Sequence, residues 1–183
     1  MNRKFILLIV LGLLLAVPIG MVIRNEMLLA DEGSIYKFTL QPIDPSDPVR
    51  GKYIILRYNT MIELDEPIQL QNGEPIYVEV KKDENGWAYF SNVSTTPPDH
   101  SAYFKTTVNY GYERTVNINV PFDKYFLNEN LAPLAESSYA ELTRHGEEFY
   151  AEVSITNGEA LLRGVYYMNR PLIDHLREMQ VDQ

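Results

Sequence analysis

The chain has 183 residues, of which 45% are apolar and 22% charged, and its formal net charge at pH 7 is −9. A chain of this length can bury one core, and its acidic excess argues against nucleic acid as a partner. The absence of cysteine excludes disulfides, thiolate nucleophiles and cysteine-ligated metals. Thirteen tyrosines and seven phenylalanines favour β-structure.

The amino-terminal segment has the pattern of a membrane anchor. Residues 5–23 are 19 uncharged, mostly apolar residues, and as a helix they would be about 28 Å long, close to the thickness of bilayer hydrocarbon. Arg3 and Lys4 precede them, which predicts a cytoplasmic N-terminus. A cleaved signal peptide is the alternative, but leucine precedes Ala30 where a small residue is expected. We therefore predict a cytoplasmic tip and single-pass anchor over residues 1–30.

A turn-rich stretch leads into a strongly apolar segment. Asp44 and Asp47 alternate with prolines in this stretch, which predicts a stiff surface loop. Gly51 then permits backbone conformations that are closed to other residues. The strand expected over residues 52–58 should be central in its sheet, because it is apolar on both faces. Its inward face carries Ile54, Leu56 and Tyr58.

Alternation of apolar and polar residues predicts strands along most of the remaining chain. These strands are expected at residues 34–41, 74–82, 87–93, 102–110, 113–120, 149–155 and 159–166. Asn85-Gly86 and Asn157-Gly158 indicate hairpin turns, because asparagine and glycine both accept positive φ. Residues 59–65 are expected to form a connector, and Gly111 to lie at a turn between two strands.

Two segments near the C-terminal half predict helices. Asp123 can cap a helix over about residues 124–144, divided at Pro133, and a short helix is expected over residues 171–179. The predicted fold class is therefore α+β and mainly β. After the transmembrane helix comes a single antiparallel domain over residues 31–183, built as a sheet or a partly open barrel with one or two helices.

The sequence patterns predict no catalytic residue, no cofactor and no metal site. The three histidines, His100, His145 and His175, lack the spacing of metal ligands, and Asp44 and Asp47 lack the order of a calcium loop. A serine–lysine pair, as in membrane-anchored proteases, would draw on Ser34, Ser46 or Ser91 and on Lys37, Lys52 or Lys105. None of these lies on a recognisable nucleophile turn. The surplus of aromatic residues leaves a sugar-binding platform as a further alternative.

The segment Gly51-Lys52-Tyr53-Ile54-Ile55-Leu56-Arg57-Tyr58 resembles the signature of the GDYXXLXY proteins, with Lys52 in the position of the family's aspartate. Residues 110–114, with the sequence Tyr-Gly-Tyr-Glu-Arg, and residues 123–129 are similar to further segments of that family. The resemblance implies a bacterial, membrane-anchored protein that acts beside an integral membrane partner. It implies no catalytic residues.

These observations predict a non-enzymatic accessory or assembly protein in the cytoplasmic membrane. Residues 5–23 would lie in the lipid bilayer, and the β-rich domain would lie on the extracytoplasmic, periplasmic side. The alternatives are a signal-peptidase-like serine/lysine hydrolase and a small-ligand or sugar-binding module. The residues predicted to form a structural motif are Asp44, Asp47, Gly51, Lys52, Tyr53, Leu56 and Tyr58.

Overall fold

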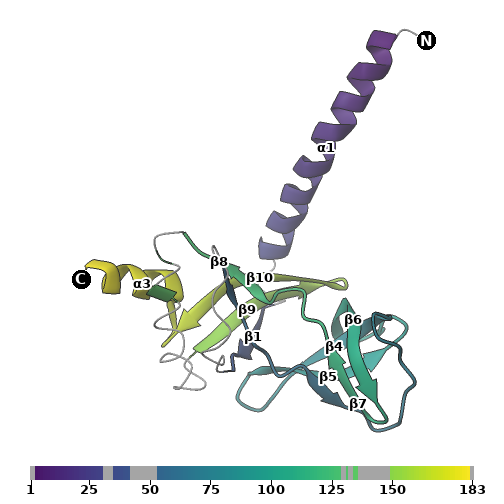
Figure 1. Ribbon diagram of the computed structural model, residues 1–183, viewed down its shortest axis with the longest axis vertical. Helices are drawn as coiled ribbons and strands as arrows, with labels where there is room; N and C mark the ends of the chain where they lie inside the picture. The colour runs from purple at the N-terminus through teal and green to yellow at the C-terminus, as the bar shows by residue number, and fades with distance from the viewer. Residues whose placement is uncertain are drawn as a thin grey trace.

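The computed structural model describes residues 3–30, 35–41, 53–128, 131, 134–135 and 149–181. The strands are β1 (Ile35–Thr39), β2 (Tyr53–Ile55), β3 (Met61–Glu63), β4 (Pro75–Lys82), β5 (Ala88–Ser94), β6 (Ala102–Tyr112), β7 (Thr115–Ile118), β8 (Lys124–Phe126), β9 (Phe149–Thr156), β10 (Glu159–Tyr167) and β11 (Arg170–Pro171). The helices are α1 (Arg3–Ala30) and α3 (Leu172–Val181) (Figure 1). The predicted residues outside the described part are Ser34, Asp44, Ser46, Asp47, Gly51, Lys52 and His145.

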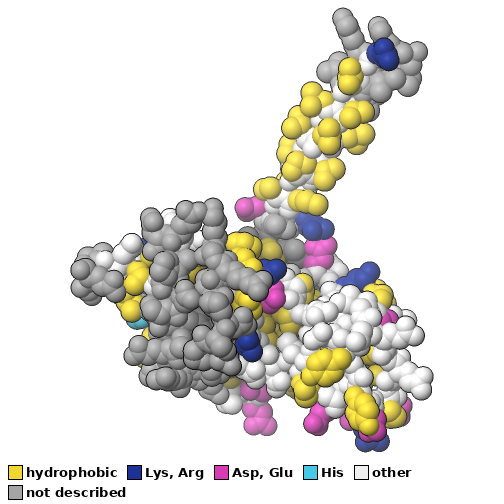
Figure 2. Space-filling model, viewed as in Figure 1, with side chains coloured by type: hydrophobic (Ala, Val, Ile, Leu, Met, Phe, Trp, Pro, Cys, Tyr) yellow, Lys and Arg dark blue, Asp and Glu magenta, His cyan; other side chains and the backbone are white. Residues whose placement is uncertain are grey.

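Helix α1 extends away from the β-rich domain, and apolar side chains cover its described surface (Figures 1 and 2). Pro18 lies inside the helix, which continues through it. Arg24 forms an ion pair with Glu159 at the start of β10, with 3.0 Å between nitrogen and oxygen, so the end of α1 contacts the domain. Over the residues that the structure describes, neither helix combines the length and the hydropathy that a bilayer crossing needs.

The first of the two larger sheets has the order β1-β9-β10-β11, and every pairing in it is antiparallel. Strand β9 lies between β1 and β10 and is buried on both faces. Asn157 and Gly158 have φ of 53° and 83° and form the predicted turn of the β9–β10 hairpin. Leu172 and Leu176, one helical turn apart on α3, are buried in the core, which confirms the predicted C-terminal helix.

The second large sheet has the order β3-β7-β6-β4-β5 and is also antiparallel. Its inner face buries alternate residues of β4, β6 and β7: Ile76, Val78, Val80, Phe104, Val108, Val116 and Ile118. Isolated bridges from Lys37 to Trp87 and from Phe104 to Gly158 join the two sheets. The structure is thus mainly β and nearly closed into a barrel, which confirms the mainly β, antiparallel part of the predicted fold class.

The prediction of a central strand over residues 52–58 is wrong. Only β2 is a strand there, and among the described residues it pairs only with β8. The apolar run has another cause, because Ile54 and Leu56 are buried in the single hydrophobic core to which both large sheets contribute. The central strand of the first sheet is β9.

The helix predicted from residue 124 begins instead as strand β8. The backbone of β2 finds its antiparallel partner there, with Ile54 opposite Tyr125. The carbonyl of Asp123 accepts the N–H of Leu56 at 2.7 Å, which ties this residue to β2 instead of to a following helix. A long-range pairing has therefore overridden a local capping signal. Leu134 and Ala135 are helical, and most of the predicted helix beyond residue 128 lies outside the described residues.

Two turns were also misplaced by the sequence patterns. The connector predicted over residues 59–65 contains β3, which pairs with β7. Gly111 lies inside β6, opposite Val116, and the turn comes at Glu113, whose φ is 52°. The residue with a left-handed backbone conformation at this turn is therefore Glu113, and not the glycine at which the turn was expected.

Candidate functional site

The segment that follows β2, Leu56 to Tyr58, joins two distant parts of the chain through hydrogen bonds. The N–H of Leu56 donates to the carbonyl of Asp123 at 2.7 Å, and the N–H of Gln41 donates to the carbonyl of Arg57 at 2.8 Å. The hydroxyl of Tyr58 donates to the buried carbonyl of Phe122 at 3.1 Å. This segment therefore holds the end of β1 and the turn before β8 together.

The Tyr58 ring is part of an aromatic cluster beneath these hydrogen bonds. It meets the rings of Phe38 and Phe122 edge to face, with centroids 5.9 and 5.2 Å apart. Edge-to-face pairs of this kind add to the stability gained from burial. Tyr53 lies outside this cluster, where it packs against Phe126 with ring centroids 5.5 Å apart. Among the predicted motif residues, the structure thus brings together Leu56 and Tyr58, and places Tyr53 at a separate contact.

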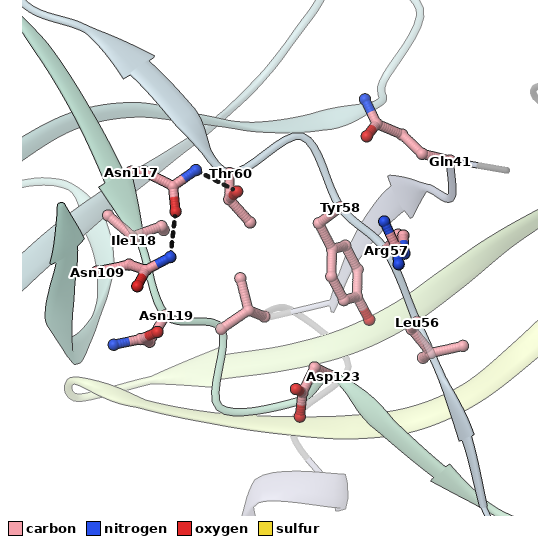
Figure 3. Close-up of a pocket in the computed structure, with 11 residues that line it drawn as sticks. Gln41, Leu56, Arg57, Tyr58, Thr60, Asn109, Asn117, Ile118, Asn119 and Asp123 are labelled. Atoms are coloured by element: carbon pink, nitrogen blue, oxygen red, sulfur yellow. Dashed lines mark hydrogen bonds between the residues drawn. The ribbon is translucent and has the colours of Figure 1, made fainter. Parts of the chain in front are cut away.

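Beside this segment lies a hollow of about 360 Å³. In Figure 3, Leu56, Arg57, Tyr58 and Asp123 lie on one side, and Asn109, Asn117, Asn119 and Thr60 lie on the other. The first group comes from the segment after β2 and from the residue before β8. The second group comes from β6, from β7 and its end, and from the residue before β3. We call this hollow the polar groove.

Hydrogen bonds fix the amide side of the polar groove. The amide of Asn109 donates to the side-chain oxygen of Asn117 at 2.9 Å, and the amide of Asn117 donates to the hydroxyl of Thr60 at 2.9 Å (Figure 3). The amide of Asn119 donates to the hydroxyl of Thr107 at 2.8 Å. These bonds hold the asparagine side chains in defined orientations.

A β-bulge in β6 explains why two of these residues meet. The register of the β6–β7 ladder shifts between Val108 and Tyr110, so Asn109 is an extra residue on β6 with no direct partner on β7. A bulge re-aims a side chain that a regular strand would point to the other face. Asn109 therefore reaches Asn117 although Tyr110 is the direct partner of Asn117 in the ladder.

The described candidates for a serine–lysine pair have other partners. The Ser91 hydroxyl donates to the Glu79 carbonyl at 3.3 Å, and the Lys37 ammonium lies 3.6 Å from a Glu152 carboxylate oxygen. Lys105 faces Tyr77 across the β4–β6 ladder. These contacts give no support to the predicted hydrolase alternative.

The histidines in the described part of the chain also lie apart. His100 is exposed in the loop before β6, and His175 packs on the ring of Tyr167 with centroids 5.1 Å apart. The described residues contain no group of three or more histidine, aspartate or glutamate side chains arranged to hold a metal. The polar groove offers hydrogen bonding through amides and hydroxyls. The charged side chains of Arg57 and Asp123 also line it.

The asparagines of the polar groove were not predicted as site residues. Asn117 and Asn119 alternate with buried residues of β7, and that alternation was visible in the sequence as a polar strand face. Asn109 depends on a bulge, and Thr60 on a strand that the sequence patterns missed. Only Asn117 on β7 and Asn119 just after it therefore belonged to a pattern that could be recognised in the local sequence.

The fold and the site define a class of protein: a mainly β, antiparallel domain that follows an apolar helix and carries a polar groove beside the segment after β2. The family model described as GDYXXLXY protein matches residues 14–165, and the chain belongs to this family. The residues that resemble the family signature end with Leu56 to Tyr58, the segment that ties the end of β1 to the turn before β8. No curated protein and no solved structure matches the chain.

Replacing Tyr58 by phenylalanine should lower the free energy of unfolding by about 1–3 kcal/mol, because the buried Phe122 carbonyl loses its donor. Urea unfolding of the full-length protein, followed by circular dichroism, measures the change. Tyr112→Phe is the matched control, since Tyr112 is exposed on β6. Equal stability of the two variants would mean that the Tyr58 hydroxyl does not hold the signature segment in place.

Proposed function

We propose that the protein is a membrane-anchored, extracytoplasmic accessory protein that assists or assembles with an integral membrane protein. Residues 5–23 lie in the cytoplasmic membrane, the N-terminus is cytoplasmic, and the β-rich domain lies on the periplasmic side. The domain acts by binding and not by catalysis.

The apolar surface of α1 is the observation that carries this proposal. Leu11, Leu14, Val17 and Val22 are all exposed, on a helix that extends away from the domain. A continuous apolar surface of this kind is unfavourable in water and marks a contact with lipid or protein. Arg3 before the apolar segment supports the proposed orientation, because positive residues favour the cytoplasmic side.

The ion pair between Arg24 and Glu159 supports the proposed arrangement at the membrane surface. Arg24 is the first charged residue after the apolar segment. If α1 lies in the bilayer, the β9–β10 hairpin sits next to the lipid headgroups. A partner in the same membrane can then contact both α1 and the domain.

Single-cysteine labelling tests the orientation, because the chain has no cysteine of its own. Glu84 lies exposed in the turn between β4 and β5, and Glu84→Cys should react with a membrane-impermeant maleimide in intact bacterial spheroplasts. Asn2→Cys should react only after lysis. Labelling of Asn2→Cys, but not Glu84→Cys, in intact spheroplasts would contradict the orientation, and release of the protein from membranes by alkaline carbonate would contradict the anchor.

Affinity purification in a mild detergent tests the partner. The expected result is one integral membrane protein, recovered in each repeat and in an amount comparable to the tagged chain. An unrelated single-span protein with the same tag controls for non-specific capture. Recovery of the tagged chain alone would count against an accessory role while leaving the labelling result intact.

A further inference from the structure

We propose that the polar groove, together with the exposed rings of Tyr110 and Tyr112, forms a binding site for a neutral oligosaccharide. The proposed occupant is a chain of sugar rings lying across the outer face of β6, β7 and β3. This site goes beyond the accessory role, because it assigns a ligand to the domain itself and does not depend on the anchor.

The register of the second sheet places aromatic and amide side chains on one face. Tyr110 on β6, Asn117 on β7 and Met61 on β3 are direct partners across the three strands. Tyr112 and Thr115 form the next pair on the same face. Directly opposed residues of antiparallel strands project to the same side and approach within about 5 Å. Tyr110 therefore lies beside Asn117 of the polar groove, and Tyr112 extends the same face by one further pair.

The amides match the hydrogen-bonding needs of sugar hydroxyls. Each hydroxyl both donates and accepts, and an asparagine side chain offers both functions. Asn109 donates to Asn117, and Asn117 to Thr60. These bonds hold the Asn109 and Asn117 side chains in place, so little side-chain entropy remains to be lost on binding. The volume of about 360 Å³ lies within the range of small-molecule sites.

The exposed tyrosines supply the apolar contact that a sugar ring also needs. Tyr110 is 45% exposed, and Tyr112 is exposed to a greater degree. An aromatic ring with a polar tip packs against the C–H face of a sugar while its hydroxyl remains hydrated. The site therefore combines a stacking surface with fixed amides, the two kinds of contact that a neutral polyol requires.

Other ligand classes fit this face less well. The strands β6 and β7 each have a hydrogen-bonded neighbour on both sides, so a peptide lying over this face finds no open ladder on them, and the open edge of the sheet belongs to β3. An anionic ligand is repelled by a protein whose net charge is −9. The positive charge of Arg57 in the polar groove is offset by the negative charge of Asp123. A neutral ligand that binds through side chains avoids both difficulties.

Calorimetric titration of the full-length protein tests the proposal, in a detergent without a sugar headgroup. The probes are maltotetraose, cellotetraose and chitotetraose, with tetra-alanine as the peptide control. We expect at least one saccharide to bind with a Kd of about 1 mM or lower. Asn117→Ala and Tyr110→Ala should each weaken that binding by roughly tenfold.

Tyr89→Ala is the matched control and should leave the affinity unchanged. Tyr89 is 47% exposed, nearly the same as Tyr110, but it lies on β5, with β4 between β5 and β6. Circular dichroism establishes that each variant is folded. The proposal is overturned if no saccharide binds at about 10 mM, if only tetra-alanine binds, or if folded Asn117→Ala and Tyr110→Ala variants keep the original affinity.

Discussion

Replacing Leu56 by alanine is expected to lower the free energy of unfolding by about 2–5 kcal/mol, the range for a buried leucine. Leu56 is 2% exposed and belongs to the core where the two large sheets meet. Its backbone is tied to Asp123, so the surrounding chain has little freedom to collapse into the space left by the side chain. Urea unfolding of the full-length protein, followed by far-ultraviolet circular dichroism, measures the loss.

Met61→Ala provides the control for this variant. Met61 is a similarly large apolar residue that lies only five positions away, on β3, but it is 50% exposed. Its replacement should change stability by no more than about 0.5 kcal/mol. If Leu56→Ala were as mild as Met61→Ala, the Leu56 side chain would not contribute to the stability of the core.

Phe104→Ala should be at least as damaging, with an expected loss of about 3–5 kcal/mol. Phe104 on β6 is fully buried, and its ring lies 5.6 Å from that of Phe90 and 5.4 Å from that of Phe122. Removing it leaves a cavity and breaks two edge-to-face contacts at once. The same unfolding measurement applies, and the midpoint should shift while the steepness of the transition is retained.

Phe126→Ala separates the effect of burial from the effect of losing an aromatic ring. Phe126 on β8 is 67% exposed, and its ring packs against that of Tyr53. We expect a change close to that of an ordinary surface substitution, within about 0.5 kcal/mol. Comparable losses for Phe104→Ala and Phe126→Ala would contradict the assignment of the core.

The elements that could be predicted from sequence are those whose signals are local. In the β9–β10 hairpin, Asn157 and Gly158 have the backbone conformations that their residue types favour, and the flanking strands pair as the turn signal predicts. In α3, Leu172 and Leu176 repeat at the helical period. Each of these features is specified by residues a few positions apart.

The elements that were missed depend on partners far away in sequence. Strand β8 forms because β2 pairs with it. The local sequence around Asp123 suggested a helix cap and contained no sign of this pairing. The short strand β3 exists through its pairing with β7. The polar groove needs both β3 and the bulge at Asn109, so its four amide and hydroxyl residues come together only in the folded sheet. The positions of Thr60 and Asn109 in the polar groove could therefore not be predicted from the periodicity of the sequence.

The pairing of β1 with β9 has a consequence for how the chain folds. β9 lies more than a hundred residues after β1, whereas the hairpins of the second sheet join neighbouring segments. Local hairpins close quickly, and distant strand pairs close late. Because synthesis runs from the N-terminus, β1 is made before the other strands, and its partner β9 is made only after more than a hundred further residues. During that interval its backbone and the side chain of Phe38 are uncovered, so nascent chains are most prone to aggregate through their first strand.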